Sequence, residues 1–132
     1  MSTQSVTLDY SAEVQHRFET APRHGRVLAT QAERRTGGAG EITRGVRVEF
    51  EMRVRDGRIA ECRFRAYGCP HVIAAASWVA EHAEGRSVNE VEWLQPRRLA
   101  ELLEAPAHKL GSLLVVEDAY RACVAGRPAP GR

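Results

Sequence analysis

An alternating stretch near the middle of the chain places the strongest restriction on its fold. From residue 46 to residue 55, apolar side chains alternate one by one with charged ones. The apolar members are Val46, Val48, Phe50, Met52 and Val54. A period of two residues is typical of a β-strand with one face against a core and the other in solvent. The stretch therefore predicts a strand of an antiparallel sheet.

A turn signal and a second alternating stretch follow this strand. Asp56-Gly57 favours a β-hairpin, and the next strand would place Ala60 and every second residue after it on the apolar face. A regular two-residue loop would set Met52 opposite the charged Glu61, because it pairs even-numbered with odd-numbered residues. We therefore predict an odd-length loop or a bulge near Gly57. The expected cross-strand pairs are Phe50 with Phe64 and Met52 with Cys62.

Sequence patterns typical of helices lie before and after the two predicted strands. The first three candidates have a capping residue or a proline at their start, and all four have a breaker after their end. The predicted helices run from Ser11 to about Thr20, from about Pro70 to Glu84, from Pro96 to about Glu104, and from about Lys109 to Ala125. The capping-box pattern of residues 87–90 predicts one more short helix. Val27–Ala32 could form a short strand, and the charged, glycine-rich residues 33–45 are typical of a mobile loop. Strands followed by helices indicate an α+β fold: a small antiparallel sheet of about three strands with helices packed on one face.

Composition narrows the class of protein. A chain of 132 residues with 43% hydrophobic and 27% charged residues fits one soluble globular domain spanning residues 1–132, with 1–9 and 127–132 flexible. A net charge of +2 gives no reason to expect nucleic-acid or membrane binding. Three cysteines without close pairing, and no signal peptide, favour a reducing, cytoplasmic location. The arginines of the predicted sheet alternate with glutamates, which favours ion pairing in solvent.

Several motifs share one order along the chain. They are YSAEVQHRFETAPRHG from Tyr10, GRIAECRFRAYGC ending at Cys69, VIAAASWVAEHAEGRSVNEV from Val72, and KLGSLLVVEDA from Lys109. In this order and spacing, the chain resembles the U-type iron–sulfur cluster assembly scaffolds, the IscU/NifU N-terminal-domain family. The likeness covers roughly residues 10–125. It implies a SufE/NifU-like α+β fold and a scaffold for iron–sulfur cluster assembly that is not an enzyme. It also implies partners: a cysteine desulfurase, an assembly chaperone or another scaffold.

The resemblance also identifies which family ligands this chain lacks. Members resemble one another in three cluster-binding cysteines and an aspartate, of which only Cys69 stands here. The other family positions carry Arg44 for the first cysteine, Val46 for the aspartate, Ser112 for the third cysteine and Gly111 for the histidine before it. The chaperone-recognition motif L-P-P-V-K corresponds to residues 105–109, which keep Pro106 and Lys109.

Three functional hypotheses follow. In the first, Cys69 at a helix N-terminus is a thiolate that accepts sulfur or binds iron, with Arg44 and Ser112 as its neighbours. In the second, substitute ligands bind iron or another metal such as zinc. The candidate ligands are Cys69, His71, His108, and Glu41 or Glu33, although His71 is more often an exposed or capping residue of a first helical turn. In the third, the protein binds the assembly machinery without carrying a cluster, because a [2Fe–2S] cluster needs about four protein ligands. The oligomeric state stays open.

Overall fold

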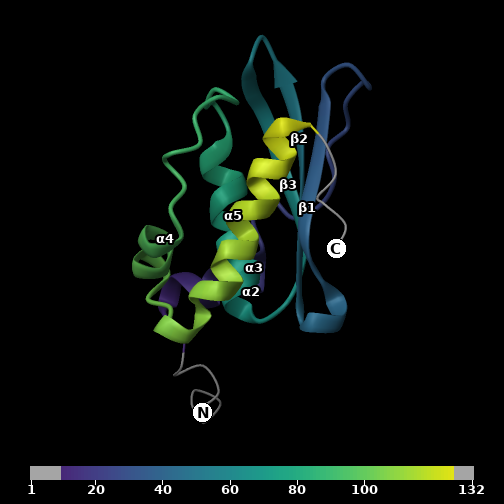
Figure 1. Cartoon of the computed structure of the whole chain (residues 1–132). Coiled ribbons are helices and arrows are strands. Elements are labelled where there is room, and N and C mark those ends of the chain that lie inside the picture. Colours follow the sequence, from purple (N-terminus) through teal and green to yellow (C-terminus); the bar gives the residue numbers. More distant parts are fainter. Residues whose placement is uncertain (1–9, 127–132) are drawn as a thin grey trace.

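The computed structural model describes residues 10–126, so the predictions for residues 1–9 and 127–132 lie outside the described part. The elements in chain order are α2 (Ala12–Thr20), β1 (Arg34–Glu41), η1 (Ile42–Arg44), β2 (Val46–Arg55), β3 (Arg58–Tyr67), α3 (Pro70–Ala83), α4 (Pro96–Leu103), η2 (Ala107–Lys109) and α5 (Leu110–Ala125). The three strands form one antiparallel sheet in the order β1-β2-β3. Helices α3 and α5 cover one face of it, and α4 lies farther out (Figure 1). The α+β prediction is confirmed.

The β2–β3 hairpin contains the predicted irregularity. Asp56 and Gly57 both have positive φ, 54° and 77°, so a two-residue turn closes the hairpin. A register shift then lies between Arg53 and Val54, and beyond it Phe50 pairs with Phe64 and Met52 with Cys62, as predicted. The bulge changes which residue at the start of β3 faces the core. Ile59 faces the core, whereas Ala60, expected on the apolar face, is exposed.

The loop predicted for residues 33–45 is wrong, because strand β1 and the 3-10 turn η1 occupy it. Its glycines allow close packing rather than mobility. A Cβ atom on Gly37 would collide with the backbone of Cys123 in α5. The strand therefore depends on the contact between β1 and α5, which no local pattern of side chains reveals.

Two short elements predicted from local signals are absent from the described structure. Val27–Ala32 forms no strand: the buried Val27 donates its backbone N–H to the Glu51 carboxylate at 3.0 Å. Residues 87–90 form a turn and no helix, although the Glu90 carboxylate does accept the Ser87 backbone N–H at 2.9 Å. Val88 donates its backbone N–H to the Gly57 carbonyl at 2.9 Å, and this hydrogen bond holds the segment against the hairpin instead.

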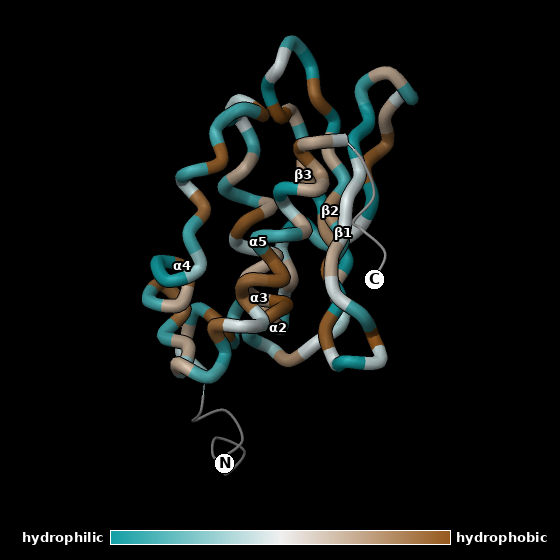
Figure 2. Tube along the Cα trace, in the orientation of Figure 1, coloured by the Kyte–Doolittle hydropathy of each residue, from teal (hydrophilic) through white to brown (hydrophobic). Residues whose placement is uncertain are grey.

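The core lies between the sheet and the helices, where hydrophobic segments of α3 and α5 face the strands (Figure 2). Helix α3 contributes mainly alanines, whose small side chains allow close approach to the sheet. Helix α5 contributes Leu113, Val116, Ala119, Tyr120 and Cys123. Leu114 in α5 and Phe18 in α2 are 46% and 45% exposed.

Candidate functional site

Cys69 occupies the N-cap of α3, directly after strand β3. Its backbone is extended, and its carbonyl accepts the N–H groups of Val72 and Ile73 at 3.0 and 3.2 Å. The Cys69 side chain makes no capping bond, so its sulfur is available to other groups. Gly68 brings the chain close to the helix, because a Cβ there would lie 3.1 Å from the Val72 side chain. The sulfur thus sits at the N-terminus of α3.

The ammonium group of Lys109 lies 3.5 Å from Cys69 Sγ. Lys109 ends the η2 turn and immediately precedes α5, so this contact joins the N-termini of α3 and α5. The cation beside the sulfur is therefore Lys109. Arg44, which we expected to have this role, is 82% exposed and forms its ion pair with Glu41 at 3.6 Å.

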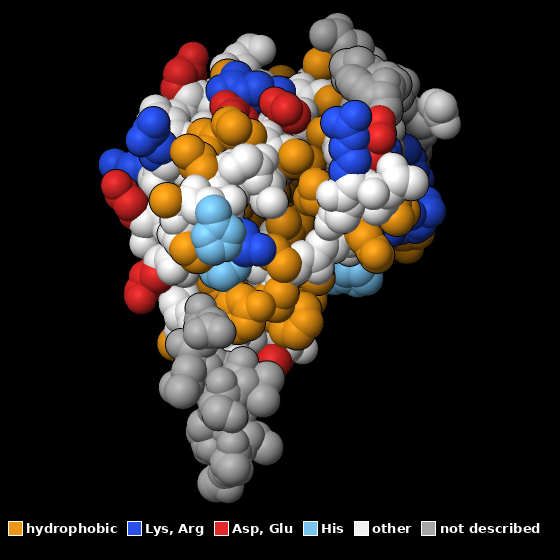
Figure 3. Space-filling view, turned by 60° about the horizontal axis from the view of Figure 1, so that its bottom comes forward, with side chains coloured by type: hydrophobic (Ala, Val, Ile, Leu, Met, Phe, Trp, Pro, Cys, Tyr) orange, Lys and Arg blue, Asp and Glu red, His pale blue; other side chains and the backbone are white. Residues whose placement is uncertain are grey.

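The other family ligand positions lie at the same end of the molecule. Residues 42–45 connect β1 to β2 next to the pair Glu41–Val46, and Arg47 pairs with Tyr67 just before Cys69. Gly111 and Ser112 form the first turn of α5, next to Lys109. Figure 3, which brings this end forward, shows histidine and Lys/Arg side chains among hydrophobic ones.

His71 is only 2% exposed, so the expectation of an exposed or capping residue is wrong. Among residues 10–126, neither ring nitrogen has a hydrogen-bond partner, and the ring of Tyr10 packs on His71 at a centroid distance of 5.0 Å. Burial, together with the charges of Lys109 and His108, lowers the pKa of His71. His108 itself is exposed. A buried imidazole without partners thus lies beside the surface that carries Cys69.

These donors do not fit a conventional metal site. Among residues 10–126, no group of three or more His, Cys, Asp or Glu side chains is placed to hold a metal ion. Cys69, His71, His108 and Glu41 are therefore not gathered around one point, and the zinc hypothesis finds no support. A [2Fe–2S] cluster needs about four protein ligands, whereas Arg44 and Val46 offer none and Ser112 offers a hydroxyl that is protonated at neutral pH. Of the positions that the resemblance compares with cluster-binding cysteines, only Cys69 carries a thiol.

Cys62 and Cys123 are buried in the core. Burial raises the pKa of the Cys62 thiol and raises that of Cys123 to about 12. Both therefore remain neutral thiols at neutral pH, which leaves Cys69 as the accessible cysteine of the described chain.

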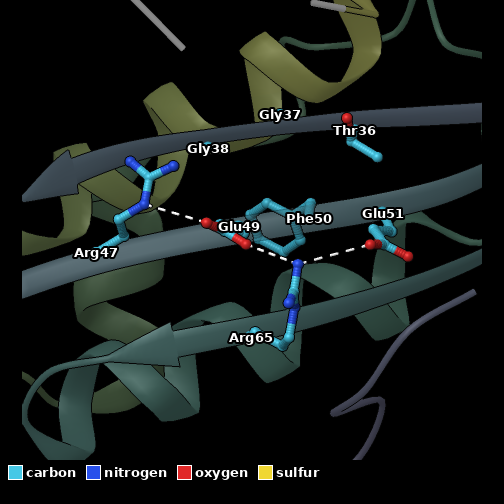
Figure 4. A pocket seen from close by; sticks show the side chains of 8 residues that line it. All are labelled: Thr36, Gly37, Gly38, Arg47, Glu49, Phe50, Glu51 and Arg65. Atoms are coloured by element: carbon cyan, nitrogen blue, oxygen red, sulfur yellow. Dashed lines mark hydrogen bonds and ion pairs between the residues drawn. The ribbon is translucent and has the colours of Figure 1, made fainter. Parts of the chain in front are cut away.

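The outer face of the sheet carries the arginines and glutamates of the alternating strands. Arg47 pairs with Glu49 at 3.2 Å, and Arg65 bridges Glu49 and Glu51 at 2.7 and 3.6 Å (Figure 4). These side chains line a hollow of about 260 Å³ beside the glycines of β1. The predicted ion pairing is confirmed.

No helix among residues 10–126 is both long enough and apolar enough to cross a membrane.

The chain combines a three-stranded antiparallel sheet with helices on one face, and it places Cys69 between β3 and the N-terminus of α3. The NifU-like N terminal domain family matches residues 9–128, and the chain belongs to this family.

Two curated relatives cover nearly the same length. The iron-sulfur cluster assembly scaffold protein IscU of Escherichia coli K12 is 31% identical over 117 residues, which are 88% of this chain and 91% of the relative. The protein of the same name from Haemophilus influenzae is 30% identical over 117 residues, covering 88% and 93%. The family resemblance seen in the sequence is thus confirmed.

Two solved structures share the fold. One is described as a cluster assembly scaffold for the SUF system of Fervidobacterium islandicum AW-1, with a TM-score of 0.67, 12% identity, and coverage of 89% of this chain and 97% of that one. The other is the N-terminal part of a NifU-like protein from Brucella abortus, with a TM-score of 0.65, 19% identity, and coverage of 88% and 92%.

Proposed function

We propose that this chain works in iron–sulfur cluster assembly as a sulfur acceptor, through Cys69, rather than as a scaffold that holds a complete cluster with its own ligands. Membership of the scaffold family supports the process. The contact of 3.5 Å between Cys69 Sγ and Lys109 Nζ supports the role of the thiol. The replacement of the other family ligands by Arg44, Val46 and Ser112 supports the absence of a self-contained cluster site.

The proposed step transfers sulfur from the persulfide of a cysteine desulfurase. The Cys69 thiolate attacks the terminal sulfur of that persulfide, and a new S–S bond forms on Cys69. The S–S bond in the desulfurase breaks, and its cysteine leaves as a thiolate. Electrons balance without an external oxidant or reductant. Lys109 acts as a positioning residue, because its charge stabilises both the attacking thiolate and the anionic persulfide that results.

Partner contact is supported by the apolar side chains at this end of the molecule. Ile42 in η1, Tyr67 at the end of β3 and Leu114 in α5 are 58%, 53% and 46% exposed. Large exposed apolar side chains are frequent where a surface binds another protein. We propose that these three side chains contact the desulfurase.

A direct test is incubation with a cysteine desulfurase and cysteine, followed by intact-protein and peptide mass spectrometry. We expect one added sulfur atom, located on Cys69 and absent from the buried Cys62 and Cys123. Cys69→Ser should abolish the addition. Lys109→Gln should slow it by roughly tenfold, through loss of one charge–charge contact, whereas Lys109→Arg should preserve most of the rate. Equal sulfur uptake by the wild type and Cys69→Ser would overturn the proposal.

Two other results would favour the other hypotheses. Desulfurase binding without sulfur transfer would identify an interaction protein. A stable cluster in the wild type after anaerobic incubation with iron and sulfide, lost in Cys69→Ser, would identify a carrier.

Restoring the family ligands provides the converse test. The variant combines Arg44→Cys, Val46→Asp, Gly111→His and Ser112→Cys. A side chain at Gly111 meets nothing within 4 Å, and Arg44 is largely exposed, so the substitutions at these two positions should not disturb the fold. After anaerobic incubation with iron and sulfide, we expect visible cluster absorption in the variant and none in the parent. If the folded variant binds no cluster, the four positions do not converge on Cys69.

A further inference from the structure

A cavity of about 540 Å³ lies between α3, the segment after it and α4. Its lining residues are Trp78, Arg86, Glu92, Trp93, Leu94, Gln95, Arg98, Leu99 and Leu102. Trp78 is nine residues along α3 from Cys69, which corresponds to about 13 Å at the rise of an α-helix. The cavity is thus separate from the Cys69 surface, and the proposed sulfur transfer uses none of its residues.

The cavity wall combines aromatic surface with guanidinium groups. Trp78 and Trp93 lie 6.1 Å apart between ring centroids, with their planes tilted by 38°. Arg86 stacks on Trp93 at 4.2 Å and is fixed by a hydrogen bond from its Nε to the His82 carbonyl at 2.8 Å. One face of each indole is thus already covered, because His82 also stacks on Trp78 at 4.0 Å.

Arg98 is the second cation of the cavity. It is exposed, and no hydrogen bond or ion pair fixes it among residues 10–126. Two arginines against the single carboxylate of Glu92 leave the cavity with an excess of positive charge. Guanidinium groups bind carboxylates and phosphates through two parallel hydrogen bonds.

We propose that this cavity binds a small molecule that combines a planar aromatic ring with an anionic group, as a mononucleotide does. The volume lies within the usual range of about 300–1,000 Å³ for small-molecule sites. The tryptophans and leucines supply apolar and stacking surface for the ring. Arg86 and Arg98 supply the donors for the anion.

The chain's own fluorescence provides the assay. The chain contains two tryptophans, and both line the cavity, so a ligand bound there changes the fluorescence of every tryptophan in the chain. We use adenosine monophosphate as the anionic probe and adenosine as its uncharged counterpart. We expect a saturable change with the monophosphate and roughly tenfold weaker binding of adenosine, because a charge-assisted hydrogen bond is lost. No saturable change at millimolar monophosphate, or equal affinities, would overturn the proposal.

Neighbouring residues offer matched control variants. Arg98→Gln should weaken monophosphate binding by roughly tenfold, whereas Arg97→Gln, at an exposed arginine outside the cavity, should leave it unchanged. Leu102→Glu, at a leucine that is 50% exposed, should weaken it by repulsion, and Leu114→Glu, at one that is 46% exposed and outside the cavity, should not. Equal losses of monophosphate affinity within either pair of variants would indicate a non-specific effect of charge and would contradict binding in this cavity. Cys69→Ser should bind the monophosphate normally, which separates this proposal from the sulfur-transfer one.

Discussion

Two buried ionisable side chains, Glu51 on the sheet and His71 beside Cys69, have opposite surroundings. Glu51 is 5% exposed, and its carboxylate accepts the Val27 N–H at 3.0 Å and lies within 3.6 Å of three arginines. His71 is 2% exposed, and neither ring nitrogen has a partner among residues 10–126. A buried polar group without partners costs about 1–3 kcal/mol. The Glu51 carboxylate avoids this cost, whereas the His71 imidazole does not.

Two glycines, Gly37 and Gly111, also differ in how closely their surroundings are packed. Gly37 on β1 has no room for a side chain, because a Cβ would collide with the backbone of α5. Gly111 in the first turn of α5 has nothing within 4 Å of the same position. The position of Gly37 is thus closed in by α5, whereas that of Gly111 is open. This difference can be tested in stability measurements.

Glu51→Ala should have the largest effect. It leaves the Val27 N–H without its acceptor and the three arginines, Arg26, Arg34 and Arg65, without their shared partner. Removing one partner of a buried ion pair costs about 3–5 kcal/mol. Glu51 is buried, but Arg26, Arg34 and Arg65 are 65%, 32% and 36% exposed. We therefore expect a loss in the lower part of that range, about 3.5 kcal/mol, in the free energy of unfolding, measured by urea denaturation. Glu49→Ala is the matched control on the same strand and face. Glu49 is 36% exposed, so its loss should be below about 1 kcal/mol. Similar losses of unfolding free energy in both variants would show that the burial and the partners of Glu51 add no stability.

Gly37→Ala should follow in size. The added methyl group meets the backbone of Cys123 rather than a flexible side chain, so β1 and α5 must move apart. Overpacking typically costs about 1–3 kcal/mol, and we expect the upper end, about 3 kcal/mol, in the same denaturation assay. A loss below about 1 kcal/mol would show that α5 does not depend on close contact with β1.

Local pattern was enough to predict β2, β3 and their register. Parity requires the even-numbered apolar residues of the two strands to face one another, and the turn signal at Asp56-Gly57 then favours Phe50 opposite Phe64, with a bulge. Helix α3 was also predictable, because Pro70 and Gly85 mark its ends. Strand β1 was not, since its glycines show no alternation and its conformation depends on packing against α5.

The candidate site was predicted in part. The motif order located Cys69. The same order places Lys109 three residues before Ser112, which is a sequence signal for the Cys69–Lys109 contact. The two residues are 40 positions apart, so their contact depends on how α3 and α5 pack. The burial of His71 could not be predicted from its own helix, because the ring that packs on it belongs to Tyr10, near the other end of the described chain.

His71→Phe should stabilise the protein. Phenylalanine keeps a ring packed against Tyr10 and removes two buried nitrogens that have no partners. Replacing unpaired polar atoms by apolar ones recovers the desolvation cost, so we expect a gain of about 1 kcal/mol in the free energy of unfolding at neutral pH. A loss of stability would show that the imidazole does have a partner in solution and would contradict the contrast with Glu51.

The same variant should also change the pH dependence of stability. The folded pKa of His71 is lowered from the ordinary value of 6.5, so below that pH the unfolded chain binds a proton that the folded chain resists. Wild-type stability is therefore full above pH 6.5 and falls as the pH drops from 6.5 toward the folded pKa. His71→Phe lacks this loss, so its advantage should grow as the pH falls through this window, in urea denaturation at several pH values. His16→Gln, at an exposed histidine, is the control. A constant difference between His71→Phe and the wild type would contradict burial of a neutral imidazole.

Gly111→Ala should have the smallest effect and the opposite sign to Gly37→Ala. The new methyl group enters open space, and alanine restricts the unfolded chain while favouring the helix, by up to about 1 kcal/mol in a helix interior. Gly111 lies in the first turn of α5, where the preference is weaker, so we expect a gain of about 0.5 kcal/mol in thermal or urea denaturation. A clear loss would mean that the space beside Lys109 is closed in solution. In that case the family histidine could not be restored there either, and failure of the four-substitution variant to bind a cluster would have a steric cause rather than a chemical one.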